Sequence, residues 1–269
     1  MKRQTRRITN LLAVMMGIMA CAVHAETESA VTLSGGFDYS SGKYGTSSTT
    51  DILSVPVNAI YETGAWSLKL TVPYLSVTSD GEVIAGGRYG RGRGMMATTT
   101  TTTTVTTTRT TRSGLGDVAT MLIYNVYSGE NYESGIDLSG RVKFGTASKA
   151  LGTGQNDYAV QVFMYRDVGD LSPNLLLGYE MLGSSAQLPL NNVFYGIAGS
   201  SYRISDGLHI GAEYKYGQKA SDTLAEQRQA TLYANLQIAT DVYLRGYVLK
   251  GYAAGSPDSG YGVLLSITY

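Results

Sequence analysis

Few residues of this chain could carry out covalent chemistry. Its single cysteine, Cys21, and one of its two histidines, His24, lie within residues 1–25. His209 is the only other imidazole that could act as a general base. If residues 1–25 are removed, no thiol remains, which excludes disulfides, cysteine-bound zinc and cysteine nucleophiles.

Residues 1–25 have the pattern of a secretory signal peptide. A basic start is followed by the apolar run LLAVMMGIMACAVHA, which is too short to span a bilayer. Cleavage after Ala25 would leave residues 26–269, a length that suits one domain. A lipoprotein cleavage site at Cys21 is the alternative, although Met19 fits that motif poorly.

The chain that would remain is mildly acidic, because the leader takes away four basic residues and no acidic one. Without an excess of lysine and arginine, no nucleic-acid partner is expected. No motif implies a cofactor. The glycines of GKYGTSS and LGTGQND lie in expected loops and not at strand-to-helix turns, so they are weak candidates for binding phosphate.

The remaining candidates for chemistry are charged residues on the polar side of alternating segments. In LHIGAEYKY, the apolar residues Leu208, Ile210 and Ala212 alternate with His209 and Glu213. Both signs of charge occur on such faces. They predict either groups that pair and hydrate one another in a water-filled interior or a charged ring that selects solutes. These lumen-lining candidates are Asp38, Lys69, Asp117, Asp137, Arg141, Lys143, Glu180, His209, Glu213, Lys215 and Arg245.

Alternation with period two runs through the whole chain after the leader and predicts twelve strands. Short turns and longer loops connect them in alternation, which is typical of a transmembrane antiparallel up-and-down β-barrel. A water-soluble sandwich with its polar face outward is the alternative. The strands are expected near residues 31–40, 51–61, 65–77, 115–127, 134–145, 156–166, 172–182, 192–203, 208–216, 228–238, 241–251 and 259–269.

Aromatic residues mark the ends of these strands, where two girdles would meet the bilayer surfaces. The last residues, YGVLLSITY, stay in phase to an aromatic C-terminus, which resembles the signal that the assembly machinery of bacterial outer-membrane barrels reads. The expected girdles comprise Tyr39, Tyr61, Trp66, Tyr74, Phe144, Tyr158, Tyr179, Tyr216, Tyr261 and Tyr269.

Two stretches resemble the outer-membrane transporter family named for the meta-pathway of phenol degradation. One is SGLGDVATMLIYNVY, with Asp117, and the other runs from Gly140 to Val168 with Lys143, a Gly-Thr-Gly loop at 152–154 and Asp157. Gly145 stands where that family usually has proline. The resemblance implies a channel, with aromatic or poorly soluble compounds as one class of solute.

The longest expected loop, residues 78–113, joins the third and fourth strands on the outer side. It contains a threonine tract and a basic cluster that could bind lipopolysaccharide phosphates or attract carboxylate solutes. The tract could continue the fourth strand, form a solvated loop or fold into the pore. The cluster comprises Arg88, Arg91, Arg93, Arg109 and Arg112.

The sequence therefore predicts a Gram-negative outer-membrane channel for passive diffusion of small solutes. Its other expected partners are outer-membrane lipids and, through the C-terminal strand, the barrel-assembly machinery. A structural or adhesive barrel that displays its loops is the main alternative, because twelve strands are intermediate between packed and open barrels. Lipid hydrolysis at His209 is a third alternative. It is disfavoured because Gly211 occupies the position two residues on, where outer-membrane phospholipases carry a serine.

Overall fold

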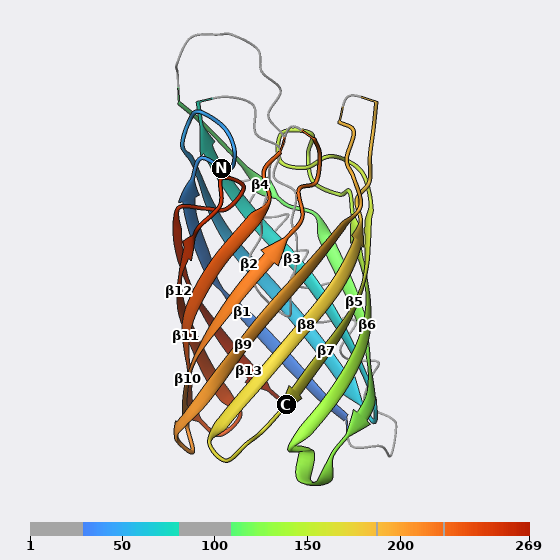
Figure 1. The fold of residues 1–269 in the computed structure, drawn as a ribbon, viewed down its shortest axis with the longest axis vertical. Coiled ribbons are helices and arrows are strands. Elements are labelled where there is room, and N and C mark those ends of the chain that lie inside the picture. Colours follow the sequence, from blue (N-terminus) through green and yellow to red (C-terminus); the bar gives the residue numbers. More distant parts are fainter. Residues whose placement is uncertain (1–28, 81–108, 187, 223) are drawn as a thin grey trace, which may run out of the picture.

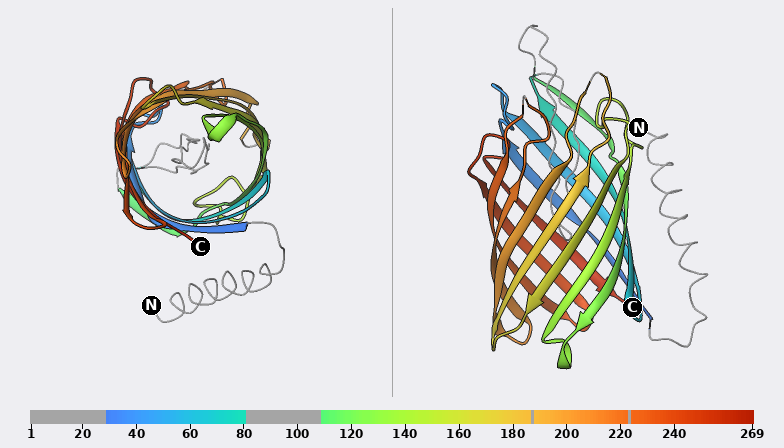
Figure 2. Two further views of the ribbon diagram at one scale, coloured as in Figure 1. Left: turned by 90° about the horizontal axis from the view of Figure 1, so that it is seen from below. Right: turned by 45° about the vertical axis from the view of Figure 1, so that its right-hand side comes forward.

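The computed structural model describes residues 29–80, 109–186, 188–222 and 224–269. One antiparallel sheet closes on itself into a barrel (Figures 1 and 2). None of the described segments is a helix long and apolar enough to cross a bilayer. The elements are β1 (Ser29–Gly42), β2 (Thr50–Thr63), β3 (Trp66–Ser79), β4 (Thr110–Leu115), β5 (Val118–Ser128), the 3-10 turn η1 (Glu130–Tyr132), β6 (Ser134–Phe144), β7 (Asp157–Arg166), β8 (Leu171–Met181), β9 (Val193–Ser205), β10 (Leu208–Gly217), β11 (Gln227–Ala239), β12 (Val242–Gly251) and β13 (Ser259–Thr268).

The barrel has twelve strands around its circumference, as the sequence predicted. Both β4 and β5 pair with β3, so together they form a single interrupted strand. The barrel closes because β1 pairs with β2 on one side and with β13 on the other. Tyr269 completes the seam by exchanging two backbone hydrogen bonds with Val31, at 3.1 and 2.9 Å.

The prediction for residues 78–113 needs a correction, because strands occupy part of that range. β3 continues to Ser79 and β4 begins at Thr110, where the sequence had placed the start of the fourth strand at residue 115. Thr110 pairs with Ser79 and Thr111 with Thr78, as expected for residues with a high β-propensity. The threonines from 98 to 108 lie outside the described residues.

The two faces of the sheet differ in polarity. Along β6, Leu138 and Phe144 are exposed, whereas Arg141 and Lys143 are buried. A single closed sheet encloses only its inner face, so the buried charges point into the barrel and the apolar residues point outward. An apolar exterior around a polar interior is the arrangement of a membrane barrel. The alternative of a water-soluble sandwich is therefore wrong.

The connections differ in length at the two ends of the barrel. Residues 64–65, 129–133, 167–170, 206–207 and 240–241 form short turns at one end, while longer loops such as 145–156 and 182–192 lie at the other. In outer-membrane barrels the short turns face the periplasm and the long loops face outward. We therefore call the two ends the periplasmic end and the outer end.

The aromatic residues of the expected girdles occupy outward positions, most of them near strand ends, whereas Tyr74 lies inside β3. Neighbouring strands bring several of them into contact. The ring centroids of Trp66 and Tyr124 are 4.5 Å apart, and those of Tyr39 and Tyr261 are 5.3 Å apart. Tyr158 and Tyr216 are exposed on the same face.

Four inward tyrosines lie directly opposite glycines on a neighbouring strand. In each pair, a Cβ atom built on the glycine would overlap the tyrosine ring, so the ring lies flat over the glycine. Gly178, for example, leaves room for Tyr195, whose hydroxyl donates a 3.0 Å hydrogen bond to Gln161. Rings that lie flat on the wall occupy less of the lumen than rings that point toward the barrel axis. The pairs are Gly135–Tyr165, Gly178–Tyr195, Gly211–Tyr233 and Gly262–Tyr247.

We expect Gly178→Val to lower the free energy of unfolding by about 1–3 kcal/mol, because the added methyl groups would displace the Tyr195 ring. Urea titration in lipid vesicles would measure the change. Gly140→Val is the control, since a Cβ at Gly140 meets nothing within 4 Å. Equal losses at the two positions would contradict the assignment of tyrosine packing to Gly178.

Candidate functional site: the charged lumen wall and the chamber below it

A cluster of buried charges lines the outer half of the lumen. Lys143 Nζ lies 2.9 Å from a carboxylate oxygen of Asp117 and 2.9 Å from one of Asp157. On the same side, Arg141 pairs with Glu180, and both side chains are almost fully buried. Four of the predicted lumen residues thus meet in one cluster. The sequence analysis quoted Asp157 for its resemblance but missed it as a site residue, although it begins β7 in phase with the inward Ala159 and Gln161.

A β-bulge turns Asp117 into the lumen. The register pairs Tyr74 with Leu115 and Thr71 with Ala119, so β3 has one residue fewer than the facing segment. The break lies opposite Pro73, which has no N–H for a ladder bond. The extra residue shifts the alternation, so that Leu115 points outward and Asp117 inward.

The cluster of Asp117, Lys143 and Asp157, called the triad below, also fastens two outer loops. Asp117 Oδ1 accepts a 2.9 Å hydrogen bond from the backbone N–H of Ala147. Asp157 Oδ1 accepts a 2.8 Å bond from the N–H of Gly183. Each carboxylate therefore uses one oxygen for Lys143 and the other for a loop, which satisfies groups that would be costly to bury unpaired.

The loop of residues 145–156 folds into the mouth of the barrel. Figure 2 shows this loop within the ring when the barrel is viewed along its axis. Its Leu151 is buried against three inward side chains of β2 and β3, Ile52, Leu75 and Val77, and against Tyr44. Burial raises the pKa of the Tyr44 phenol, which stays neutral and donates a 2.7 Å hydrogen bond to Ser40. The outer mouth is thus narrowed on this side by a fixed apolar contact.

A chamber of about 480 Å³ opens in the periplasmic half of the lumen. Its volume falls in the range of pockets that hold small molecules. One part of its wall is aromatic and aliphatic, and the rest carries polar and charged groups. The lining residues are Asp137, Phe163, Tyr165, Ser172, Asn174, Leu176, Ile197, Ser201, Glu213, Tyr233 and Arg245.

Arg245 is the only cation among the residues that line this chamber. Its guanidinium lies over the ring of Tyr233, 4.2 Å from the centroid, and 4.0 Å from a carboxylate oxygen of Glu213. The latter distance is too long for a hydrogen bond. Within the described residues, Arg245 Nε has no hydrogen-bond partner. On the facing part of the wall, Asp137 accepts a 2.8 Å bond from Asn125.

The other predicted lumen residues lie apart from these two groups. Asp38 accepts a hydrogen bond from Tyr247 near the seam, while Lys69 and Lys215 occupy inward positions of β3 and β10. His209 is paired in register with Arg203 and Asn235 at the periplasmic end. Among the described residues, no serine or threonine forms a hydrogen bond with His209.

The structure describes only part of the basic cluster predicted for residues 78–113. Arg88, Arg91 and Arg93 lie outside the described residues. Arg109 forms an ion pair with Asp51, and Arg112 sits opposite Val77 on β3. Arg109 is therefore partly neutralised.

Comparison with solved structures shows the same barrel in three proteins. The COG4313 outer membrane channel from Pseudomonas putida F1 has a TM-score of 0.67 at 12% identity, over 91% of this chain and 97% of that one. The NanC porin has a TM-score of 0.53 at 10% identity, over 88% and 98% of the two chains. The KdgM porin has a TM-score of 0.51 at 11% identity, over 88% and 99%. The chain therefore has the fold of outer-membrane channels and porins.

No protein-family model matches the sequence, and no curated protein does.

We expect Lys143→Met to lower the free energy of unfolding by about 3–5 kcal/mol, because it leaves two buried carboxylates without their cation. The loop of residues 145–156 should also loosen, which trypsin cleavage after Lys149 would report on folded barrels in vesicles. Lys219→Met is the control, since Lys219 makes only an exposed 3.5 Å contact with Asp222. Unchanged cleavage in Lys143→Met would contradict the fastening role of the triad.

Proposed function

We propose that the protein is an outer-membrane channel for the passive diffusion of small solutes. The observation that carries this proposal is the 480 Å³ chamber within a lumen lined by charged and polar side chains. A barrel filled by its own side chains would have a packed interior at this place. The three structural neighbours, described as a channel and two porins, support the proposal at the level of the fold.

The lumen charges would set the selectivity of such a channel. Lys143 lies between two aspartates, Arg141 is paired with Glu180, and Arg245 faces Glu213. Because the cations of the inner wall are largely balanced by neighbouring carboxylates, strong selection for one sign of charge is not expected from it. The arginines of residues 88–112 would add attraction for anions at the mouth.

We further propose that preferred solutes combine a small apolar body with one polar group. Phe163 and Ile197 would offer an apolar surface, and the guanidinium of Arg245, which lines the same chamber, would attract a carboxylate or hydroxyl. Aromatic and other poorly soluble compounds with one such group belong to this class. Binding would be weak, since the acidic groups of the chamber oppose an anion, and weak binding lets a solute leave.

We also propose how the chain reaches and occupies the membrane. Residues 1–25 would direct export and be removed, and the C-terminal strand ending in Tyr269 would engage the barrel-assembly machinery. The outward aromatic residues would form belts that contact the lipids at both surfaces. Arg88, Arg91, Arg93 and Arg109 would contact lipopolysaccharide.

A second candidate, a barrel that displays its loops to a partner, is favoured by one observation. The triad and the cluster around Leu151 hold the loop of residues 145–156 in one place. A fixed loop suits recognition by a partner as well as it suits a narrowed mouth. The two functions differ in whether ions pass through the lumen.

We expect purified full-length barrel to give discrete conductance steps in a planar bilayer. Ions passing through the hydrated lumen would cause these steps. They are measured as single-channel current at constant voltage. Absence of steps from protein shown to be folded would contradict the channel and leave the displayed-loop barrel.

We expect Leu176→Trp to lower the single-channel conductance roughly twofold, because the larger side chain fills part of the chamber. The control is Leu175→Trp, since Leu175 is the preceding residue of β8 and is exposed on the outer face. An equal effect of both substitutions would show that the chamber is not on the solute path.

A further inference from the structure

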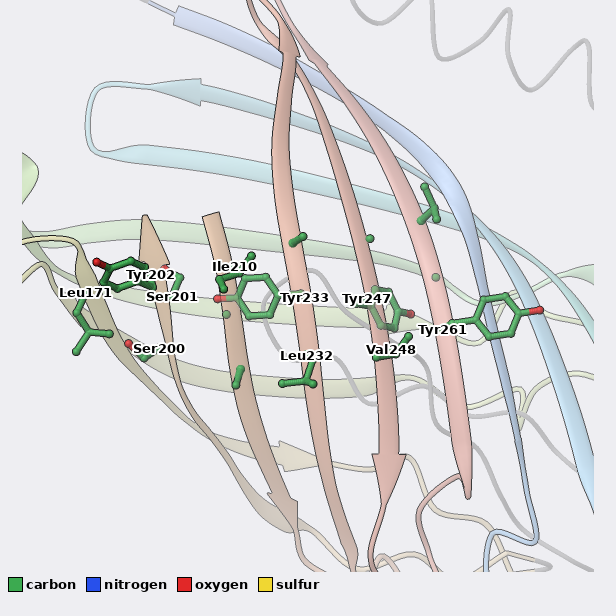
Figure 3. A pocket seen from close by; sticks show the side chains of 16 residues that line it. Leu171, Ser200, Ser201, Tyr202, Ile210, Leu232, Tyr233, Tyr247, Val248 and Tyr261 are labelled. Carbon is green, nitrogen blue, oxygen red and sulfur yellow. The ribbon is translucent and has the colours of Figure 1, made fainter. Parts of the chain in front are cut away.

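A shallow apolar hollow of about 760 Å³ crosses the outer face of β9 to β13. Figure 3 shows its lining side chains on these neighbouring strands, including Ile210, Leu232, Val248 and Tyr261. These four are all exposed. They alternate with inward residues, so the hollow belongs to the lipid-facing side and is separate from the chamber in the lumen.

The hollow exists because small residues meet at its centre. Register places Ser200 beside Ala212, and Ala234 beside Gly246, on adjacent strands. Larger side chains surround these positions, for example Leu232 opposite Ala212. The centre is therefore recessed relative to its rim.

Two basic residues lie on the same face just beyond the outer edge of the hollow. Lys250 is exposed and two residues beyond Val248 on β12, where it pairs with Ala230. Arg228 is two residues nearer the outer end than Ala230 on β11, so it is a diagonal neighbour of Lys250.

These two basic residues lie at the level of the outer aromatic residues. Arg228 pairs in register with Tyr216, and its guanidinium carbon lies 6.0 Å from that ring centroid. Tyr214 shares the register row of Ala230 and Lys250. Aromatic residues at this height mark the boundary between headgroups and acyl chains. Glu226 pairs with Arg228 at 2.6 Å. Because Lys250 adds a second positive charge, Lys250, Arg228 and Glu226 together keep a net positive charge.

We propose that this surface binds a phosphorylated lipid of the outer leaflet. Lys250 and Arg228 would hold the phosphate, and an acyl chain would lie in the hollow beneath it. The two parts of the surface match the two parts of such a lipid in charge, in polarity and in order from the headgroup level inward. The proposal depends on the outer-membrane fold and not on passage of solutes through the lumen.

A second copy of the chain fits this surface less well. A twofold contact joins the same patch on both subunits and would bring the basic group of one copy close to that of the other. Lipid phosphate instead neutralises the group. The occupant we infer is therefore a lipid.

The test is the amount of lipid A that the full-length barrel retains in nanodiscs of phosphatidylcholine with a minor share of lipid A, counted by native mass spectrometry. We expect a Lys250→Gln, Arg228→Gln double variant to retain at least about tenfold less lipid A. Lys219→Gln, in an outer loop, is the charge control. Gly246→Leu should place a side chain in the hollow and so also reduce the retention of lipid A. A Cβ at Gly246 meets nothing within 4 Å, so the substitution fits without displacing other residues.

Gly140→Leu is the control for the hollow, since Gly140 lies in equally open space on the outer face of β6. Retention of lipid A that is unchanged in both the double variant and Gly246→Leu would overturn the proposal. Loss of lipid A in Gly246→Leu but not in the double variant would also overturn it, because the hollow would then bind an acyl chain without recognition of the phosphate. Dimers that dissociate on Gly246→Leu would assign the surface to a second copy.

Discussion

Closure of the backbone hydrogen-bond network is the constraint on which the rest of this structure depends. A bilayer offers no water to an unpaired N–H or C=O, so a sheet can cross it only without free edges. Here the last residue, Tyr269, bonds to Val31, and β13 pairs with β1 along its length. Once the sheet is closed, its outer face must suit lipid and its inner face can carry charge. The alternation of the sequence follows from that requirement.

The interior satisfies its charges differently at the two ends. In the outer half, Lys143 is enclosed by two carboxylates that also bind loop N–H groups, so the charges are buried and the loops are fixed. In the periplasmic half, Arg245 lines an open chamber, where its guanidinium lies over the ring of Tyr233. The first arrangement suits a rigid mouth, and the second suits contact with a solute. The four tyrosines that lie over glycines are held against the barrel wall.

Much of this fold could be predicted from the sequence, because each strand carries its own period of two. The alternation in LHIGAEYKY, for instance, is enough to place Glu213 on the inner face. What could not be predicted depends on residues that meet across strands. The bulge that turns Asp117 inward lies opposite Pro73, and the space for Tyr195 requires Gly178 at the matching register position. The diagonal position of Arg228 and Lys250 beside a hollow likewise depends on the register between β11 and β12.

If the chamber is part of a water-filled path through the barrel, a side chain that lines it must be accessible to soluble reagents. Single cysteines at Asn174 and Leu175 test it, since Asn174 lines the chamber and Leu175 faces outward on the same strand. The only natural cysteine, Cys21, lies within the expected leader. The measurement is single-channel current before and after a charged, membrane-impermeant thiol reagent is added. We expect a stepwise fall in current for Asn174→Cys and none for Leu175→Cys; current unaffected at Asn174 despite complete modification would show that the chamber lies off the path.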